Sequence, residues 1–146
     1  MRPKWASGTY TIKNPDKYLG LKTPRYRSSW EQVFMRFCDE NPSVAKWASE
    51  SIKIPYQNPL NGKHTVYVPD FFIQYVDKDG KSKSELIEIK PKRQTRIQAA
   101  EKGISTKAAV AMNNAKWEAA GAWCRQKGIK FRVLTEDDIF HNPKRR

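Results

Sequence analysis

The spacing of apolar residues predicts an amphipathic helix near the start of the patterned part of the chain. Apolar side chains at positions 30, 33, 34, 37 and 38 form one face of a helix that opens at Ser28. The Asn41-Pro42 pair ends it, because the residue before a proline disfavours the helical conformation. A short second helical piece is expected over 43–48, given Trp47 and Ala48.

Strand patterns follow in the middle of the chain. Alternation over 52–56 predicts a short strand, and Pro55 indicates an edge position. The segment Thr65–Val76 is rich in β-branched and aromatic residues and is the strongest strand signal in the chain. A turn at 77–80 joins it to Glu85–Lys90, whose apolar side chains on both faces are typical of a central strand. These last two segments are predicted to form a hairpin.

The second half of the chain predicts a helical crossover and one more strand. A short helix is expected within the basic stretch 92–102, and a longer one over Thr106–Lys127, with Gly128 as its C-terminal cap. Phe131–Leu134 forms the next strand, and residues 135–138 resemble a capping box that opens a last helical turn. The predicted fold class is therefore α/β, with a mixed central sheet flanked by helices.

Composition places the chain among globular proteins of one domain. It has 146 residues, of which 38% are hydrophobic. No apolar run approaches the ~20 residues that span a bilayer, and no signal peptide is evident, so we expect a soluble protein without a membrane partner. Cys38 and Cys124 lie within helical patterns and are expected to be free buried thiols. Neither His64 nor His141 lies near a cysteine at zinc-ligand spacing, so a structural zinc site is not expected.

Charge is the first indication of a partner. The chain carries 28 basic and 15 acidic residues, a formal net charge of +13, and such a field attracts nucleic acid. Residues 1–27 hold seven basic residues and one acid without any regular period, which indicates an extended basic arm laid over the domain or over DNA. A solvated tail is the alternative. We therefore divide the chain into an arm (1–27), a domain (28–140) and a basic tail (141–146).

The candidate chemistry lies on the predicted hairpin. Val68-Pro69-Asp70 sits in the middle of one strand, and Glu88-Ile89-Lys90 in the next. Glu88 and Lys90 are two residues apart and must share a face, and Asp70 can lie opposite them. Two carboxylates bind Mg²⁺ while leaving coordination places for substrate oxygens and water, and a lysine can hold the attacking water or steady the charge on a phosphate. This set suits phosphodiester hydrolysis.

The bare spelling of these motifs carries little weight. Pro15-Asp16 and Asp79-Gly80-Lys81 repeat it outside any strand pattern. The weight comes from adjacent strands, the right alternation and burial together. A cross-strand ion pair that stabilises the hairpin is the structural alternative. Acids and a lysine within apolar strands are costly unless paired or used, which favours a functional role.

Four segments carry a family resemblance: Ser29-Trp30-Glu31, Tyr67-Val68-Pro69-Asp70-Phe71, Ile87-Glu88-Ile89-Lys90-Pro91 and the strand segment 128–135. Over about 28–140 the chain resembles the PD-(D/E)XK nuclease superfamily, with its restriction-endonuclease-like αβββαβ core. More narrowly, it is similar to the N-terminal catalytic domain of the endonuclease subunit of Tn7-type transposons and to phage head completion nucleases. The arm and the basic tail find their likeness in the phage proteins.

The resemblance implies roles for individual residues. Asp70 and Glu88 would be ligands of Mg²⁺, or of Mn²⁺, and Lys90 would be the catalytic lysine. The family's fourth member, an acid on the first helix, would be Glu31, as a further metal ligand. Glu31 also lies three residues after Ser28, where a capping-box glutamate would reach back to a backbone amide, and that alternative stays open.

Other basic residues are candidates for phosphate contacts that do not read sequence. For Lys116, a position on the solvated face of the long helix explains the charge as well as a phosphate contact does. The candidate DNA-binding residues are Lys92, Arg93, Arg96, Lys102, Lys116, Arg25 and Arg27.

The resemblance also implies a setting. DNA is the expected substrate, portal, neck or head proteins of a phage are candidate partners, and the host cytoplasm during assembly is the expected location, with the virion as a second one. A helix with the glutamine and tyrosine of some exonuclease branches is not found after Lys90, which favours endonuclease or structure-selective cleavage.

Three alternatives to the endonuclease remain at this stage. The chain could be a structural DNA-binding protein of head or neck assembly whose nuclease chemistry is vestigial, although intact Asp70, Glu88 and Lys90 argue against decay. It could be a transposase partner that cuts one strand. An RNA-binding module is the weakest alternative, because the aromatic residues follow core patterns rather than a stacking surface.

Overall fold

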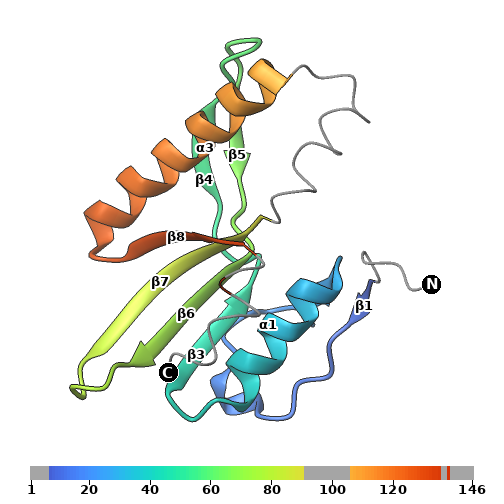
Figure 1. The fold of residues 1–146 in the computed structure, drawn as a ribbon, viewed down its shortest axis with the longest axis vertical. Helices are drawn as coiled ribbons and strands as arrows, with labels where there is room; N and C mark the ends of the chain where they lie inside the picture. The colour runs from blue at the N-terminus through green and yellow to red at the C-terminus, as the bar shows by residue number, and fades with distance from the viewer. Residues whose placement is uncertain (1–6, 91–105, 136–137, 139–146) are drawn as a thin grey trace.

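A four-stranded mixed sheet, in the order β3-β6-β7-β8, forms the centre of the molecule (Figure 1). The computed structural model describes residues 7–90, 106–135 and 138. Strands β3 (Val44–Ser49), β6 (Phe71–Val76) and β7 (Ser82–Ile89) are antiparallel neighbours, and β8 (Lys130–Leu134) runs parallel to β7. With helices α1 and α3, the chain order is αβββαβ. The predicted α/β, restriction-endonuclease-like core is thus confirmed.

The two helices cover opposite faces of this sheet. Neighbouring residues of β7 point to opposite sides, and each helix packs against a different set of them. Helix α1 (Ser29–Glu40) shares its apolar cluster with Ile87 and Ile89, whereas α3 (Thr106–Lys127) shares its cluster with Leu86. Strand β7 is therefore apolar on both faces, as predicted for a central strand. Helices α1 and α3 thus pack against the residues of β7 on either side of Glu88.

The predicted helical piece over 43–48 is wrong, because these residues form strand β3. Trp47 pairs with Ile73 of β6 and is fully buried. The register shifts between Val44 and Lys46, and this irregularity resets the alternation of side chains. Val44 and Trp47 are therefore both buried although they are three residues apart, a spacing that imitates a helix.

The segment Thr65–Val76, predicted as one strand, is divided in two. Its first part, β5 (His64–Tyr67), pairs with β4 (Ile54–Gln57) in a separate two-stranded ribbon, and only its second part joins the central sheet as β6. The break falls at Val68-Pro69-Asp70, where Pro69 is buried and has no N–H to donate to a neighbouring strand. The strand predicted over 52–56 therefore belongs to this ribbon and not to the central sheet.

The described part of the N-terminal arm lies over the domain. Short strands β1 (Gly8–Thr9) and β2 (Arg25–Tyr26) pair with each other, and a 3₁₀ turn η1 (Pro15–Lys17) lies between them. The buried carboxylate of Asp39 accepts hydrogen bonds from the Tyr10 hydroxyl and from the N–H groups of Lys13 and Asn14, at 2.7, 2.8 and 3.0 Å. The arm thus packs on α1. The domain boundary at residue 27 remains a proposal.

The remaining expectations concern the second half of the chain. Helix α3 has the predicted bounds, and Gly128 behind it has a positive φ of 69°, a conformation that glycine adopts without strain. Cys38 and Cys124 are buried free thiols. No helix within the described ranges is long and apolar enough to cross a membrane. The short helix expected within 92–102 and the tail 141–146 lie outside the described residues.

Candidate active site

Asp70 lies in the bend between β5 and β6, and not in mid-strand as predicted. Its Oδ2 atom accepts a hydrogen bond from the backbone N–H of Ile89 at 2.7 Å. Phe71 pairs with Ile87 in the sheet, so the next residue back along the chain, Asp70, faces Glu88. The predicted opposition of Asp70 and Glu88 therefore holds, although a bend rather than a regular strand produces it.

Glu88 projects from β7 on the side of the sheet that α3 covers. Its Oε1 atom accepts a hydrogen bond from the hydroxyl of Tyr67 at 2.8 Å. The positive charges of Lys90 and Lys116 both lower the pKa of Glu88, and Nζ of Lys116 lies 5.8 Å from the ring centroid of Tyr67, the residue hydrogen-bonded to Glu88. The structure thus brings together the two carboxylates and the lysine that the sequence selected.

The two carboxylates are unfavourably charged in each other's presence. Burial raises the pKa of Asp70 well above its usual range, and the charges of Glu88, Glu31 and Glu50 raise it further. Burial also raises the pKa of Glu88, against the hydrogen bond from Tyr67 and the charges of the two lysines. A cation placed between Asp70 and Glu88 would relieve this repulsion and restore both charges.

Glu31 lies in the first turn of α1, the helix that Ser28 caps. The hydroxyl of Ser28 accepts a hydrogen bond from the N–H of Glu31 at 3.2 Å, and Glu31 accepts one from the N–H of Arg27 at 2.8 Å. The capping alternative is therefore observed. Burial raises the pKa of Glu31, and the negative charges of Glu50 and Glu88 raise it further. The Glu31 carboxylate therefore interacts electrostatically with the acids of the site.

Two residues of this region were missed by sequence reasoning. Tyr67 stands in the segment that carries the resemblance, but a hydroxyl donor to Glu88 could be recognised only once the bend at Pro69 was known. Glu50 directly follows β3, its N–H donates to the carbonyl of Asp70 at 2.9 Å, and its carboxylate pairs with Arg27. The wrong helix prediction over 43–48 hid the fact that Glu50 ends a strand beside the site.

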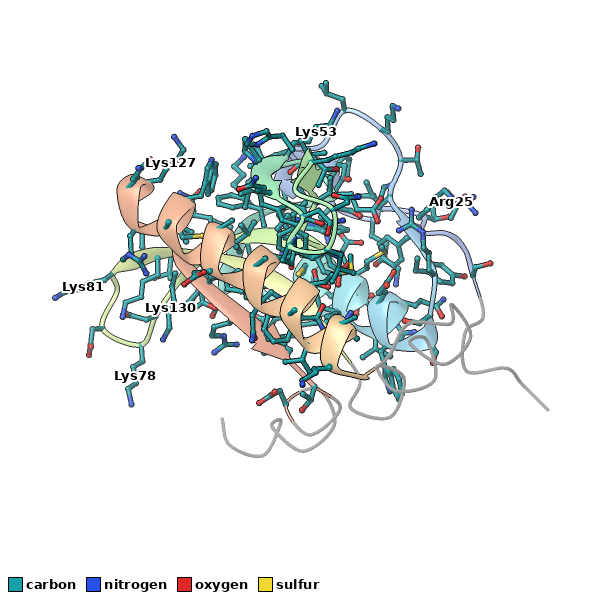
Figure 2. The ribbon with its side chains drawn as sticks, turned by 90° about the horizontal axis from the view of Figure 1, so that it is seen from above. Arg25, Lys53, Lys78, Lys81, Lys127 and Lys130 are labelled. Carbon is teal, nitrogen blue, oxygen red and sulfur yellow. The ribbon has the colours of Figure 1, made fainter. Side chains whose placement is uncertain are left out.

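The candidate DNA-binding residues are only partly described. Lys92, Arg93, Arg96 and Lys102 lie outside the described residues. Arg27 and Lys116 lie at the acidic cluster, next to Glu50 and Glu88 respectively. Arg25 is exposed on the arm, and Figure 2 shows it on the opposite side of the molecule from a group of lysines that the sequence did not single out, namely Lys78, Lys81, Lys127 and Lys130.

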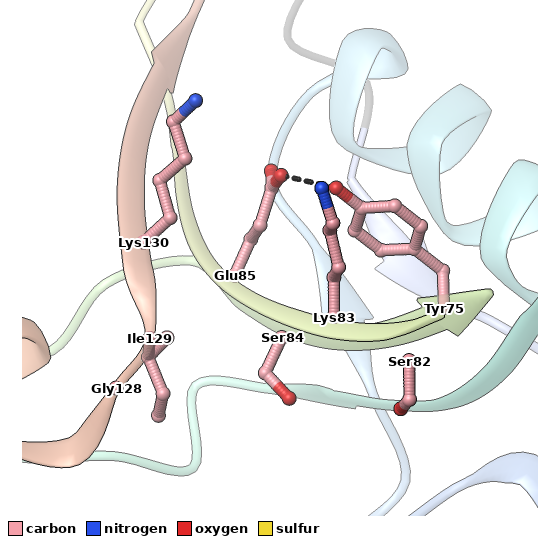
Figure 3. Close-up of a pocket in the computed structure, with 8 residues that line it drawn as sticks. All are labelled: Tyr75, Ser82, Lys83, Ser84, Glu85, Gly128, Ile129 and Lys130. Carbon is pink, nitrogen blue, oxygen red and sulfur yellow. Dashed lines mark hydrogen bonds between the residues drawn. The ribbon is translucent and has the colours of Figure 1, made fainter. Parts of the chain in front are cut away.

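The other glutamate of β7, Glu85, is buried and has a different environment. The hydroxyl of Tyr75 donates to its Oε2 atom at 2.6 Å, and Nε of Arg132 lies 3.0 Å from Oε1. Glu85 lines a pocket of about 430 Å³ between residues 82–85 and 128–130 (Figure 3). This pocket lies toward the start of β7, whereas Glu88 lies near its end. Glu85 is therefore paired with an arginine, whereas Glu88 faces a second carboxylate.

The acidic side chains of this region are candidate ligands of a metal ion. Over the described ranges, no three Asp, Glu, His or Cys side chains converge in an arrangement that could hold one. Asp70, Glu88 and Glu31 do not form a three-carboxylate centre. The pair Asp70 and Glu88 nevertheless has the chemistry that Mg²⁺ requires, namely two hard oxygen donors whose mutual repulsion a divalent cation relieves.

The chain is similar to known nucleases over most of its length. A family model described as the TnsA-like endonuclease N terminal matches residues 41–136. The chain belongs to this family. It is also 36% identical over 143 residues to the head completion nuclease of Enterobacteria phage T4, an alignment that covers 91% of this chain and 93% of that protein. These relationships confirm the suspected resemblance and support a nuclease role.

The extent of the two matches distinguishes parts of the site. The TnsA-like match contains Glu50, Asp70, Glu88 and Lys90, but it begins after α1 and therefore leaves Glu31 outside. The similarity to the phage protein covers 91% of this chain and therefore reaches beyond the residues of the TnsA-like match. A TnsA-like nuclease domain in this chain is thus combined with flanking sequence that a phage relative shares.

Proposed function

We propose that this protein is a metal-dependent DNA endonuclease that hydrolyses phosphodiester bonds and processes DNA ends during phage head completion. The single observation that carries the proposal is the meeting of Asp70 and Glu88 beside Lys90 in a chain of a nuclease family. The name of the phage T4 relative supports the head completion setting.

In this proposal Asp70 and Glu88 hold a divalent cation, with Mg²⁺ expected and Mn²⁺ as a substitute. Such an ion, when bound, neutralises phosphate charge and acidifies water. Ile89 orients the Asp70 carboxylate through its N–H, and Tyr67 orients that of Glu88. Both carboxylates are fixed by donors, which preorganises them for a ligand.

Lys90 is proposed to act on the water or on the phosphate. Its positive charge lowers the pKa of Glu88, and it follows Ile89, whose N–H binds Asp70, which supports a place for Lys90 near the scissile phosphate. There it can orient the attacking water or stabilise the extra negative charge as one P–O bond forms to water and the P–O bond to the leaving sugar oxygen breaks. Glu31 is proposed to add negative charge at the edge of the pair.

Binding of the DNA backbone is proposed to use the basic residues on both sides of this cluster. The net charge of +13 supplies attraction that does not depend on sequence. Arg27 and Lys116 are the described candidates nearest the acids, with Arg25 farther out on the arm. Lys92, Arg93, Arg96 and Lys102 follow Lys90 in the sequence and remain proposed contacts.

The setting is proposed from the phage relative. Portal, neck or head proteins are candidate partners, and the host cytoplasm during assembly is the proposed location, with the virion as a second one. A structural DNA-binding protein of head assembly would share this setting but would not cut DNA.

The proposal is tested by cleavage of plasmid and branched DNA with Mg²⁺ or Mn²⁺, with EDTA as the metal-free control. Wild type is compared with Asp70→Ala and Lys90→Ala. Metal-dependent cutting that both substitutions abolish, with folding and DNA binding retained, is the expected result. Tight binding without cutting on every substrate would overturn the proposal in favour of the structural role.

A further inference from the structure

Arg27 and Glu50 form an ion pair at the edge of the acidic cluster. The guanidinium group binds the carboxylate through two nitrogens, Nη1 to Oε2 and Nη2 to Oε1, which fixes its direction as well as its position. The side chains remain 59% and 34% exposed, so a ligand arriving from solvent can reach them. Two of the five N–H donors of a guanidinium point to the carboxylate, which leaves others for a second anion.

The backbones of both residues are anchored to the proposed active site. The N–H of Glu50 donates to the carbonyl of Asp70 at 2.9 Å, and the N–H of Arg27 donates to the carboxylate of Glu31 at 2.8 Å. Arg27 belongs to the arm and Glu50 follows β3, so the pair joins the arm to the domain at this point. The guanidinium group is therefore held beside Asp70 and Glu31 by contacts at both ends.

Stabilisation of the fold alone is a weak explanation for this pair. An exposed ion pair contributes little to stability, because water screens the two charges and the long side chains lose conformational freedom. Glu50 has a φ of 49°, a left-handed conformation that is uncommon for residues other than glycine and that destabilises the fold. The strain offsets most of what the pair can contribute, which favours a role for Glu50 at the site.

We propose that Glu50 is a positioning residue that holds the guanidinium group of Arg27 against a backbone phosphate of the DNA, next to the scissile bond. This inference rests on the proposed nuclease function and deepens it by naming how the substrate is held. Arginine suits the task because its planar donors match two oxygens of one phosphate. Glu50 acts through Arg27 and does not itself touch the substrate.

The inference predicts an effect of unusual sign. Removing an acid from a protein that binds DNA normally strengthens binding, because repulsion of the phosphates is lost. Glu50→Gln should instead weaken binding by about threefold, since the arginine loses its partner. Arg27→Ala should weaken binding more and reduce the slope of log affinity against log salt by about 1. In the Arg27→Ala background, Glu50→Gln should no longer weaken binding.

Glu40→Gln is the matched control. Glu40 also forms an exposed ion pair between domain and arm, with Lys13 at 2.8 Å, at the far end of α1 from Glu31. It should leave DNA affinity unchanged or increase it. Glu50→Asp keeps the charge but withdraws the carboxylate by one methylene, so it should also weaken binding; binding equal to wild type would overturn the positioning role.

The measurement is fluorescence anisotropy of a labelled duplex with each variant, in EDTA, where no cleavage occurs. Melting temperatures establish that each variant folds. The inference is supported if Glu50→Gln and Glu50→Asp weaken binding in the wild-type background and Glu50→Gln has no such effect in the Arg27→Ala background. The inference is overturned if Glu50→Gln tightens binding, or if Glu50→Gln weakens binding equally in the wild-type and Arg27→Ala backgrounds. If wild type cuts DNA with Mg²⁺, such a result overturns this inference alone; a wild type that does not cut removes the proposed function first.

Discussion

The backbone N–H of Ile89 donates a hydrogen bond to Oδ2 of Asp70 over 2.7 Å. This bond joins the bend after β5 to the strand that carries Glu88, so the separation of the two carboxylates is set by the register of β6 on β7. The site is therefore a property of the hairpin as a whole. Substitutions at Asp70 should therefore show how much its charge destabilises the metal-free protein and how much a bound metal ion stabilises it.

Asp70→Asn should stabilise the metal-free protein at pH 8. Because burial and neighbouring acids raise the folded-state pKa of Asp70 above its unfolded value, the favourable contribution of this group is complete below the unfolded pKa. That contribution is lost as the pH rises through the folded pKa, so the charged carboxylate disfavours folding at pH 8. The neutral asparagine removes the penalty and can still accept from Ile89.

Thermal unfolding in EDTA at pH 5 and pH 8 checks this prediction, with the larger gain expected at pH 8. Added Mg²⁺ should raise the melting temperature of wild type but not of Asp70→Asn, because an ion that binds only the folded state stabilises it. A variant less stable than wild type at pH 8 without metal would show that Asp70 is a structural acid.

Tyr67→Phe should lower the cleavage rate about tenfold, the usual loss when a group that orients a metal ligand is removed. The hydroxyl bond at 2.8 Å lowers the pKa of Glu88, so its loss should shift the acid limb of the pH–rate profile to higher pH. Tyr75→Phe is the matched control, because it removes a hydroxyl from Glu85 instead. Equal losses of activity in both variants would contradict a specific role for Tyr67.

Asp39→Asn should destabilise the protein by about 2 kcal/mol, because the carboxylate accepts bonds from three groups of the arm. Burial opposes ionisation, but the hydrogen bonds from Lys13, Tyr10 and Asn14 outweigh it and hold the pKa below its ordinary value of 3.8. A depressed folded-state pKa stabilises the fold above the unfolded pKa.

That stabilisation is lost as the pH falls through the folded pKa of Asp39. Urea unfolding at pH 7 and near pH 3 should therefore show the difference between wild type and Asp39→Asn shrinking in acid. Glu40→Gln, at an exposed ion pair, should cost less than about 1 kcal/mol. An Asp39→Asn variant as stable as wild type at pH 7 would mean that the arm contributes nothing to the fold.

The central motif could be predicted from the sequence because it depends on local alternation. Glu88 and Lys90 are two residues apart in an apolar strand, and the turn after Val76 sets the hairpin that brings Asp70 across from them. The helix Ser29–Glu40 was similarly predictable, since Ser28 caps it and its apolar face is regular.

What could not be predicted depends on contacts between distant segments. Val44 and Trp47 show helical spacing because a register shift interrupts β3, and only the pairing with β6 reveals a strand. The bend at Pro69 assigns β5 to a ribbon, which brings Tyr67 to Glu88. The partnership of Arg27 with Glu50 crosses 23 positions of sequence and leaves no local signal.

The most direct test of the proposed active site compares two glutamates of the same strand, Glu88→Gln and Glu85→Gln, in Mg²⁺-dependent cleavage of DNA. Each carboxylate accepts a bond from one tyrosine hydroxyl, at 2.8 and 2.6 Å, but only Glu88 faces Asp70. Glu88→Gln should lower the rate by about two orders of magnitude or more, because a proposed metal ligand is lost. Glu85→Gln should keep near wild-type activity while losing stability. Retained cleavage in Glu88→Gln, or equal loss in both variants, would contradict the assignment of the site.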